Sequence, residues 1–128
     1  MEENMYDGNL LQIISYKANN LYEYLDLIKC SGKKSVLYIG ERSIIALDFH
    51  IQGYESACRI RGIEEILNPP FGYFHSFVAD YYSYGKTSRG WRQIILLENN
   101  NDEEKSLEVF WQLLDLFRKD ENYLLKTV

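Results

Sequence analysis

The chain has 128 residues, 46% of them hydrophobic, a length that suits one domain with a single buried core. Its net charge of −5 argues against a protein that grips phosphate backbones, because that needs a continuous basic face, so we expect no nucleic-acid partner. The longest apolar runs, such as Ile94–Leu97, are too short to cross a membrane. The acidic first residues are unlike a secretory leader, so we expect a cytoplasmic protein.

Acidic residues concentrate towards both ends of the chain. Residues 1–28 carry five acids and one base, 29–92 carry nine bases and six acids, and 93–128 carry eight acids and four bases. Acidic surface favours the capture of a basic partner, although it also serves solubility alone. Cys30 and Cys58 have no Cys-x-x-Cys spacing and are expected to be free thiols.

The first elements in the chain are a loose start over 1–9 and an apolar stretch from Leu10. Residues 10–17 are an apolar stretch of undecided type and 36–39 fit either a short strand or an extended loop, so a short N-terminal hairpin of the two is one interpretation. Between them Asn20 and Glu23 form a capping box, which predicts a helix that ends near Gly32.

The middle of the chain carries a long helical stripe. Apolar residues recur at steps of 3 and 4 from Ile44 to Cys58, which predicts a helix of about four turns that ends near Gly62. Gly53 lies inside this helix, and a close helix crossing would explain its presence. A short helical turn is expected at 63–67, before Asn68-Pro69-Pro70.

Three segments complete the predicted fold. The spacing from Phe74 to Tyr81 predicts a helix, whereas 91–97 fits either a helix or a buried strand, of which we favour the helix. A second capping box, Asn101 with Glu104, begins a last helix with a broad apolar face. The sequence therefore predicts a mostly α protein, a compact single-domain bundle of about five helices over residues 1–128.

Catalytic and cofactor motifs are not recognisable in the sequence. Gly85-Lys86-Thr87 resembles the end of a phosphate-binding loop, but Asp80 stands where that loop needs a glycine. His50 and His75 are the only histidines and lack metal-binding spacing. We expect no metal, no cofactor and no enzyme activity; the alternative is a small hydrolase or nuclease that uses His75 or His50.

The region from Asp80 to Tyr84 is the strongest candidate for a binding surface. Tyr81 and Tyr84 lie on one side of a helix and Tyr82 on another, so one narrow stripe cannot bury all three. Exposed tyrosines beside an acid are typical of partner-binding anchors. Tyrosines placed at the edge of a core are an equally good interpretation.

Several short motifs, spread over residues 20–120, resemble one known family. They are Tyr38–Ser43, Gly53-Tyr54 with Ala57, Phe74-His75 with Phe77-Val78, Ser88–Trp91, Asp102–Leu107, Phe110 and Leu113–Asp115. With these motifs the chain resembles the small bacterial immunity proteins encoded beside polymorphic toxins and contact-dependent growth inhibition systems. It departs from them in residues 1–18 and in Ser31–Lys34, where a Pro-Gly turn is expected.

The resemblance implies a non-catalytic inhibitor that binds a cognate toxin C-terminal domain, expected to be a nuclease, and blocks its active site or an adjacent surface. The partner-binding residues expected on this basis are Asp80, Tyr81, Tyr82, Tyr84, Glu98, Asp102, Glu103 and Glu104. A regulatory or scaffold domain is a second alternative. Whether the protein is a monomer or a homodimer stays open.

Overall fold

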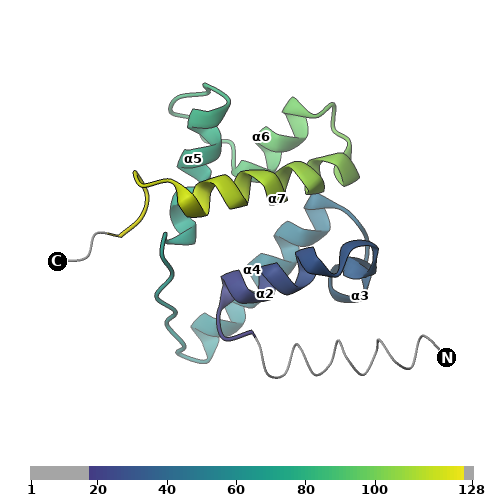
Figure 1. The fold of residues 1–128 in the computed structure, drawn as a ribbon, viewed down its shortest axis with the longest axis vertical. Coiled ribbons are helices and arrows are strands. Elements are labelled where there is room, and N and C mark those ends of the chain that lie inside the picture. The colour runs from purple at the N-terminus through teal and green to yellow at the C-terminus, as the bar shows by residue number, and fades with distance from the viewer. Residues whose placement is uncertain (1–17, 126–128) are drawn as a thin grey trace.

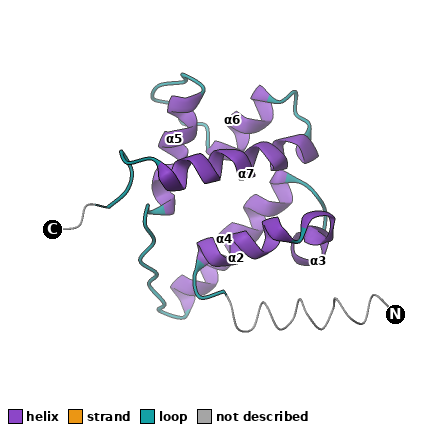
Figure 2. Ribbon diagram, viewed as in Figure 1, coloured by secondary structure: helices purple, strands orange, loops and turns teal. Residues whose placement is uncertain are grey.

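The computed structural model describes residues 18–125 and is a mostly helical bundle, as the sequence predicts. The described α-helices are α2 (Leu21–Cys30), α3 (Val36–Ile39), α4 (Ile44–Ile60), α5 (Phe74–Tyr81), α6 (Trp91–Glu98) and α7 (Glu103–Lys119), with 3₁₀ turns at Gly32–Ser35 and Phe71–Tyr73. Figure 2 shows helices and loops, and no strand, in this part of the chain. The segment 91–97 is therefore helical, as favoured.

Helix α7 lies across the middle of the molecule, as Figure 1 shows. It packs against α5 and α6 on one side and against α4 on the other, while α2 and α3 lie near α4. No helix within residues 18–125 combines the length and the apolar character that crossing a bilayer needs.

One part of the core is a cluster of aromatic side chains gathered around Phe74, which is fully buried. The rings within 5.3–5.5 Å of the Phe74 ring belong to Phe71, Trp91, Phe110 and Phe117. These residues come from α5, α6, α7 and the turn before α5. Edge-to-face ring contacts add stabilisation beyond simple burial, so this cluster fixes how α5, α6 and α7 pack.

Side-chain caps begin three of the helices. The carboxamide of Asn20 accepts a hydrogen bond from the Glu23 amide at 2.9 Å, which confirms Asn20 as the cap. The Glu23 carboxylate accepts from the Asn19 amide at 3.0 Å instead of from Asn20, so the reciprocal bond of the predicted capping box does not form. The cap of α7 is Asp102 and not Asn101, so that prediction was wrong by one residue. Asn101 has a φ of 59°, in the left-handed region, whereas a cap needs extended backbone.

Two expected local structures are wrong. Val36–Ile39 is helical rather than a strand, because the chain continues from α2 through a 3₁₀ turn directly into α3. The other half of the expected hairpin, residues 10–17, lies outside the described residues. Gly53 does not mark a close helix crossing, since a Cβ atom built there meets nothing within 4 Å.

The expected helical turn at 63–67 is also wrong, because this segment has no regular secondary structure and runs as a drawn-out loop between α4 and α5 (Figure 1). The Ile63 amide donates to the Cys58 carbonyl at 2.8 Å, and Gly62 has a φ of 68°. Together these features form the C-terminus of α4, which is closed by a residue in the left-handed conformation. Beyond that point the Glu65 carboxylate holds the chain against α2 and α4, as described below. We call residues 63–67 the extended segment.

Candidate partner-binding surface

The end of α5 turns back sharply and brings Tyr84 beside its own helix. Ser83 has a φ of 61°, and the Tyr84 amide donates to the Ala79 carbonyl at 2.8 Å. This closing turn ends the helix at Tyr81. The C-terminal ends of α5 and α6 lie at the same end of the molecule (Figure 1).

A hydrogen bond joins these two helix ends. The Tyr84 hydroxyl donates to Glu98 Oε2 at 2.8 Å, although the two residues are 14 positions apart. This bond to the carboxylate is the main reason that the pKa of Tyr84 is raised. The structure therefore brings together two residues that the sequence identified separately.

Tyr81 is the most exposed aromatic residue of this region, with 54% of its surface accessible. Its ring lies 5.0 Å from the ring of Tyr82 in an edge-to-face arrangement and 6.3 Å from the ring of Phe77. Tyr82 is half-buried and packs against the core. Burial raises the pKa of Tyr82. The Tyr81 ring is thus supported from two sides while one face is available to a partner.

Asp80 faces the C-terminal turn, where its Oδ2 accepts a hydrogen bond from the Tyr123 hydroxyl at 3.2 Å. We call Asp80, Tyr81, Tyr82, Tyr84 and Glu98 the tyrosine surface. All five are on α5, on the turn after it or on the last residue of α6.

The other three predicted residues have structural partners at the start of α7. Asp102 caps that helix through the Lys105 amide at 3.0 Å. Glu103 accepts a hydrogen bond from the Ser43 hydroxyl at 2.6 Å, and Glu104 forms an ion pair with Arg42 at 2.8 Å. These contacts join the N-terminus of α7 to the N-terminus of α4, so part of the acidity serves the fold.

Glu65 is a central polar residue that the sequence did not identify as functional. Its Oε1 accepts from the Leu21 amide at 2.9 Å, and its Oε2 accepts from the Tyr54 hydroxyl at 2.5 Å and lies 4.0 Å from the Cys58 sulfur. Burial is the first cause of the raised pKa of Tyr54, with the Glu65 carboxylate adding to it. The partners are 44, 11 and 7 positions away, and no local pattern links them.

The histidines occupy separate environments. His50 Nε2 lies 2.8 Å from the Tyr24 hydroxyl, and burial lowers the pKa of His50. His75 is half-buried, and its Nδ1 has no hydrogen-bond partner among residues 18–125. The same residues contain no group of three or more His, Cys, Asp and Glu side chains arranged to hold a metal ion. Cys30 and Cys58 are free thiols, as expected.

Comparison with known proteins gives no relative of this chain: no family model, no curated protein and no solved structure matches it.

Proposed function

We propose that this protein is an immunity protein that binds and neutralises a toxin domain through the tyrosine surface. The observation that carries the proposal is the exposed Tyr81 ring, held beside Tyr82 at the end of α5 and next to the Tyr84–Glu98 hydrogen bond. Tyrosine is enriched among the residues that dominate binding energy at protein interfaces. The motif resemblance supplies the class of partner.

The chemistry of this surface suits a basic protein. Tyr81 offers a ring face for a cationic or apolar side chain, and the carboxylates of Asp80 and Glu98 lie on the same helix ends. Toxin domains that cleave nucleic acids carry basic surfaces, because they bind phosphate. A tyrosine-rich and acidic inhibitor complements such a surface, and its charge speeds the encounter.

The test is calorimetric titration with the C-terminal toxin domain encoded immediately upstream, at two salt concentrations. We expect tight binding that weakens as salt increases. Replacing Tyr81 by Ala removes the exposed anchor and should weaken binding about 30-fold, which corresponds to about 2 kcal/mol.

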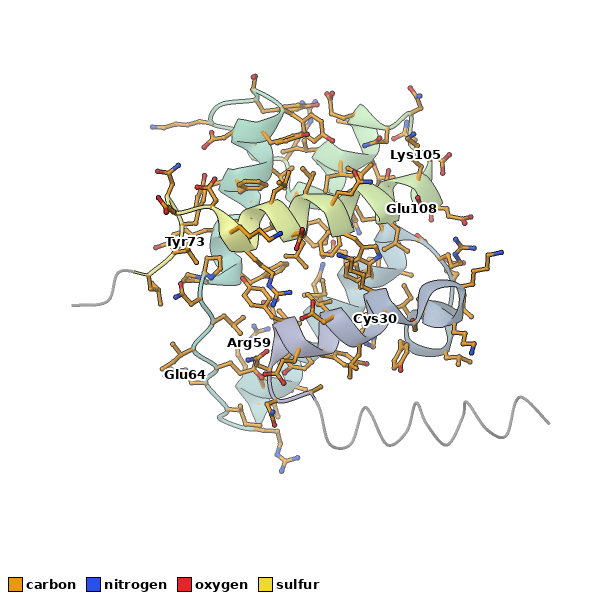
Figure 3. All side chains as sticks on the ribbon, viewed as in Figure 1. Cys30, Arg59, Glu64, Tyr73, Lys105 and Glu108 are labelled. Atoms are coloured by element: carbon orange, nitrogen blue, oxygen red, sulfur yellow. The ribbon has the colours of Figure 1, made fainter. Side chains whose placement is uncertain are left out.

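Tyr73 offers a matched control for this substitution. It is 52% exposed, its ring lies 6.3 Å from that of Tyr123, and it precedes α5, whereas Tyr81 ends this helix. Figure 3 marks its position. Tyr73→Ala should change affinity less than about threefold. Equal effects of the two substitutions would show that the tyrosine surface is not the contact.

Gene context separates immunity from a scaffold role. A toxin gene directly upstream is expected for an immunity protein, and failure of its product to bind would remove the proposal. If that product fails to bind and a housekeeping protein binds through Tyr81 instead, the regulatory or scaffold alternative is correct.

A further inference from the structure

The extended segment carries main-chain groups that have no hydrogen-bond partner among residues 18–125. Among the described residues, none donates to or accepts from the main-chain N–H and C=O groups of Glu64, Glu65, Ile66 and Leu67. The segment is held by other contacts: the Glu65 side chain binds α2 and α4, and Leu67 packs against the core. An ordered, extended chain with free main-chain groups is a template for one more strand.

From Glu64 to Leu67 the side chains alternate as in a β-strand. Glu65 and Leu67 are half-buried, whereas Glu64 and Ile66 are exposed. Ile66 is 87% exposed and Ile63 is 54% exposed. Of the exposed residues in this segment, only Glu64 is charged. Exposed apolar side chains such as these two isoleucines are typical of interaction sites rather than of protected edges.

Two hollows adjoin the segment and share three carboxylates. One has a volume of about 290 Å³ and reaches Leu21 and Arg59; the other has a volume of about 420 Å³ and reaches Phe71 and Leu125. Both are lined by Glu55, Glu64 and Glu65. Figure 3 shows Glu64 on the outer side of the chain between α4 and α5. With three glutamates against one arginine, these hollows favour cationic side chains.

We propose that the extended segment is a docking edge for an extended, basic segment of another protein, which adds to it as a strand. The main chain of the partner pairs with the free N–H and C=O groups of residues 64–67, and its Lys or Arg side chains, at every second position, enter the two hollows. The free main-chain groups require an extended occupant, and the carboxylates require a basic one. A second copy of this chain fits less well, because it would bring the same acidic segment to these glutamates in a protein of net charge −5.

This surface is separate from the tyrosine surface, so its test needs no toxin. The probe is the peptide acetyl-Val-Lys-Val-Lys-Val-amide, added to the isotope-labelled full chain and followed by amide NMR shifts and hydrogen exchange. We expect weak binding, with a Kd of about 10⁻⁴ to 10⁻³ M. The amides of residues 64–67 should exchange fast in the free protein and about tenfold more slowly with bound peptide.

Two matched peptides separate strand pairing from charge attraction. The Lys peptide N-methylated at its three central residues keeps the charge, but methyl groups interrupt the donors on both of its edges, and it should bind at least about fivefold more weakly. The peptide with Glu in place of Lys keeps the main chain but should not bind. Equal binding of the N-methylated peptide would overturn the proposal.

A pair of substitutions places the contact on the protein. Glu64→Lys should weaken binding of the Lys peptide about fivefold, while Glu108→Lys, the same charge change at an exposed position of α7, should have little effect. Equal effects would mean that net charge alone attracts the peptide and would overturn the proposal. Amides of residues 64–67 that are already protected in the free protein would overturn it as well, because the edge would then be covered by the chain itself.

Discussion

The removal of the Glu65 carboxylate tests how the extended segment is held. This side chain accepts hydrogen bonds from the amide of Leu21, a buried residue at the start of α2, and from the hydroxyl of Tyr54 on α4. Glu65→Ala leaves both donors without their partner, and it also removes a negative charge from the N-terminus of α2, where helix dipoles favour one.

The expected loss of folding stability in Glu65→Ala follows from these contacts. A hydrogen bond to a charged group contributes about 1.5–3 kcal/mol, so two such bonds give about 3–6 kcal/mol. Glu65 is only half-buried, and water can reach the freed donors in part, so we expect the lower end, about 3 kcal/mol. Glu65→Gln still accepts from the Leu21 amide and should cost about 1 kcal/mol.

The assay is urea unfolding, followed by the fluorescence of Trp91 and Trp111 and by far-UV circular dichroism. A loss of 3 kcal/mol lowers the unfolding midpoint by about 2 M for a slope of about 1.5 kcal/mol per M. Glu64→Ala is the matched control, because Glu64 is an exposed neighbour, and it should change stability by less than about 0.5 kcal/mol. If Glu65→Ala costs no more than Glu64→Ala, the carboxylate does not hold the segment.

Three further predictions concern stability. Burial raises the pKa of Tyr22, so above pH 10 the unfolded chain loses a proton from this residue that the folded chain keeps. Tyr22 should therefore contribute up to about 1.4 kcal/mol per pH unit to a fall in stability with rising pH, and the fall should be shallower in Tyr22→Phe, measured by unfolding at about pH 9–11.5. Phe74 is fully buried among aromatic rings, so Phe74→Ala should lower the free energy of unfolding by about 3–5 kcal/mol in the same urea assay, and Phe74→Leu by less than half as much. Near-neutral effects of both substitutions would contradict the aromatic cluster around Phe74. Ser43→Ala should lower the unfolding free energy by about 1–2 kcal/mol, because it removes the cap of α4 and the hydroxyl that binds Glu103; an unchanged melting temperature would contradict this.

The elements that sequence predicted well are those fixed by local patterns. The α4 stripe, the Asn20 cap and the helix from Phe74 to Tyr81 each depend on residues within four positions of one another. The tyrosine surface was found in part for the same reason, because Tyr81, Tyr82 and Tyr84 are neighbours in the chain. Its pairing with Glu98 could not be predicted, since it depends on how α5 packs against α6.

Two of the wrong predictions failed because contacts outside the segment, or the turn before it, set its conformation. Residues 63–67 have the composition of a helical turn, but the Glu65 carboxylate bonds to Leu21 and Tyr54 and holds the chain extended. Val36–Ile39 has the β-branched composition of a strand, but it continues helically from a 3₁₀ turn. These influences outweigh local propensity, because helix and strand propensities differ between most residue types by only about 1 kcal/mol or less per residue.

The contacts of the acidic residues change what the charge of this protein implies for binding. The sequence suggests a uniformly acidic C-terminal region, yet Asp102, Glu103 and Glu104 are engaged with the Lys105 amide, Ser43 and Arg42. A carboxylate already paired with a cation attracts a basic partner less, because the two charges cancel at a distance. Glu98 differs from Glu104, since its hydrogen-bond partner Tyr84 is neutral. The salt dependence of partner binding should therefore depend on Glu98 far more than on Glu104, although the two residues are only six positions apart.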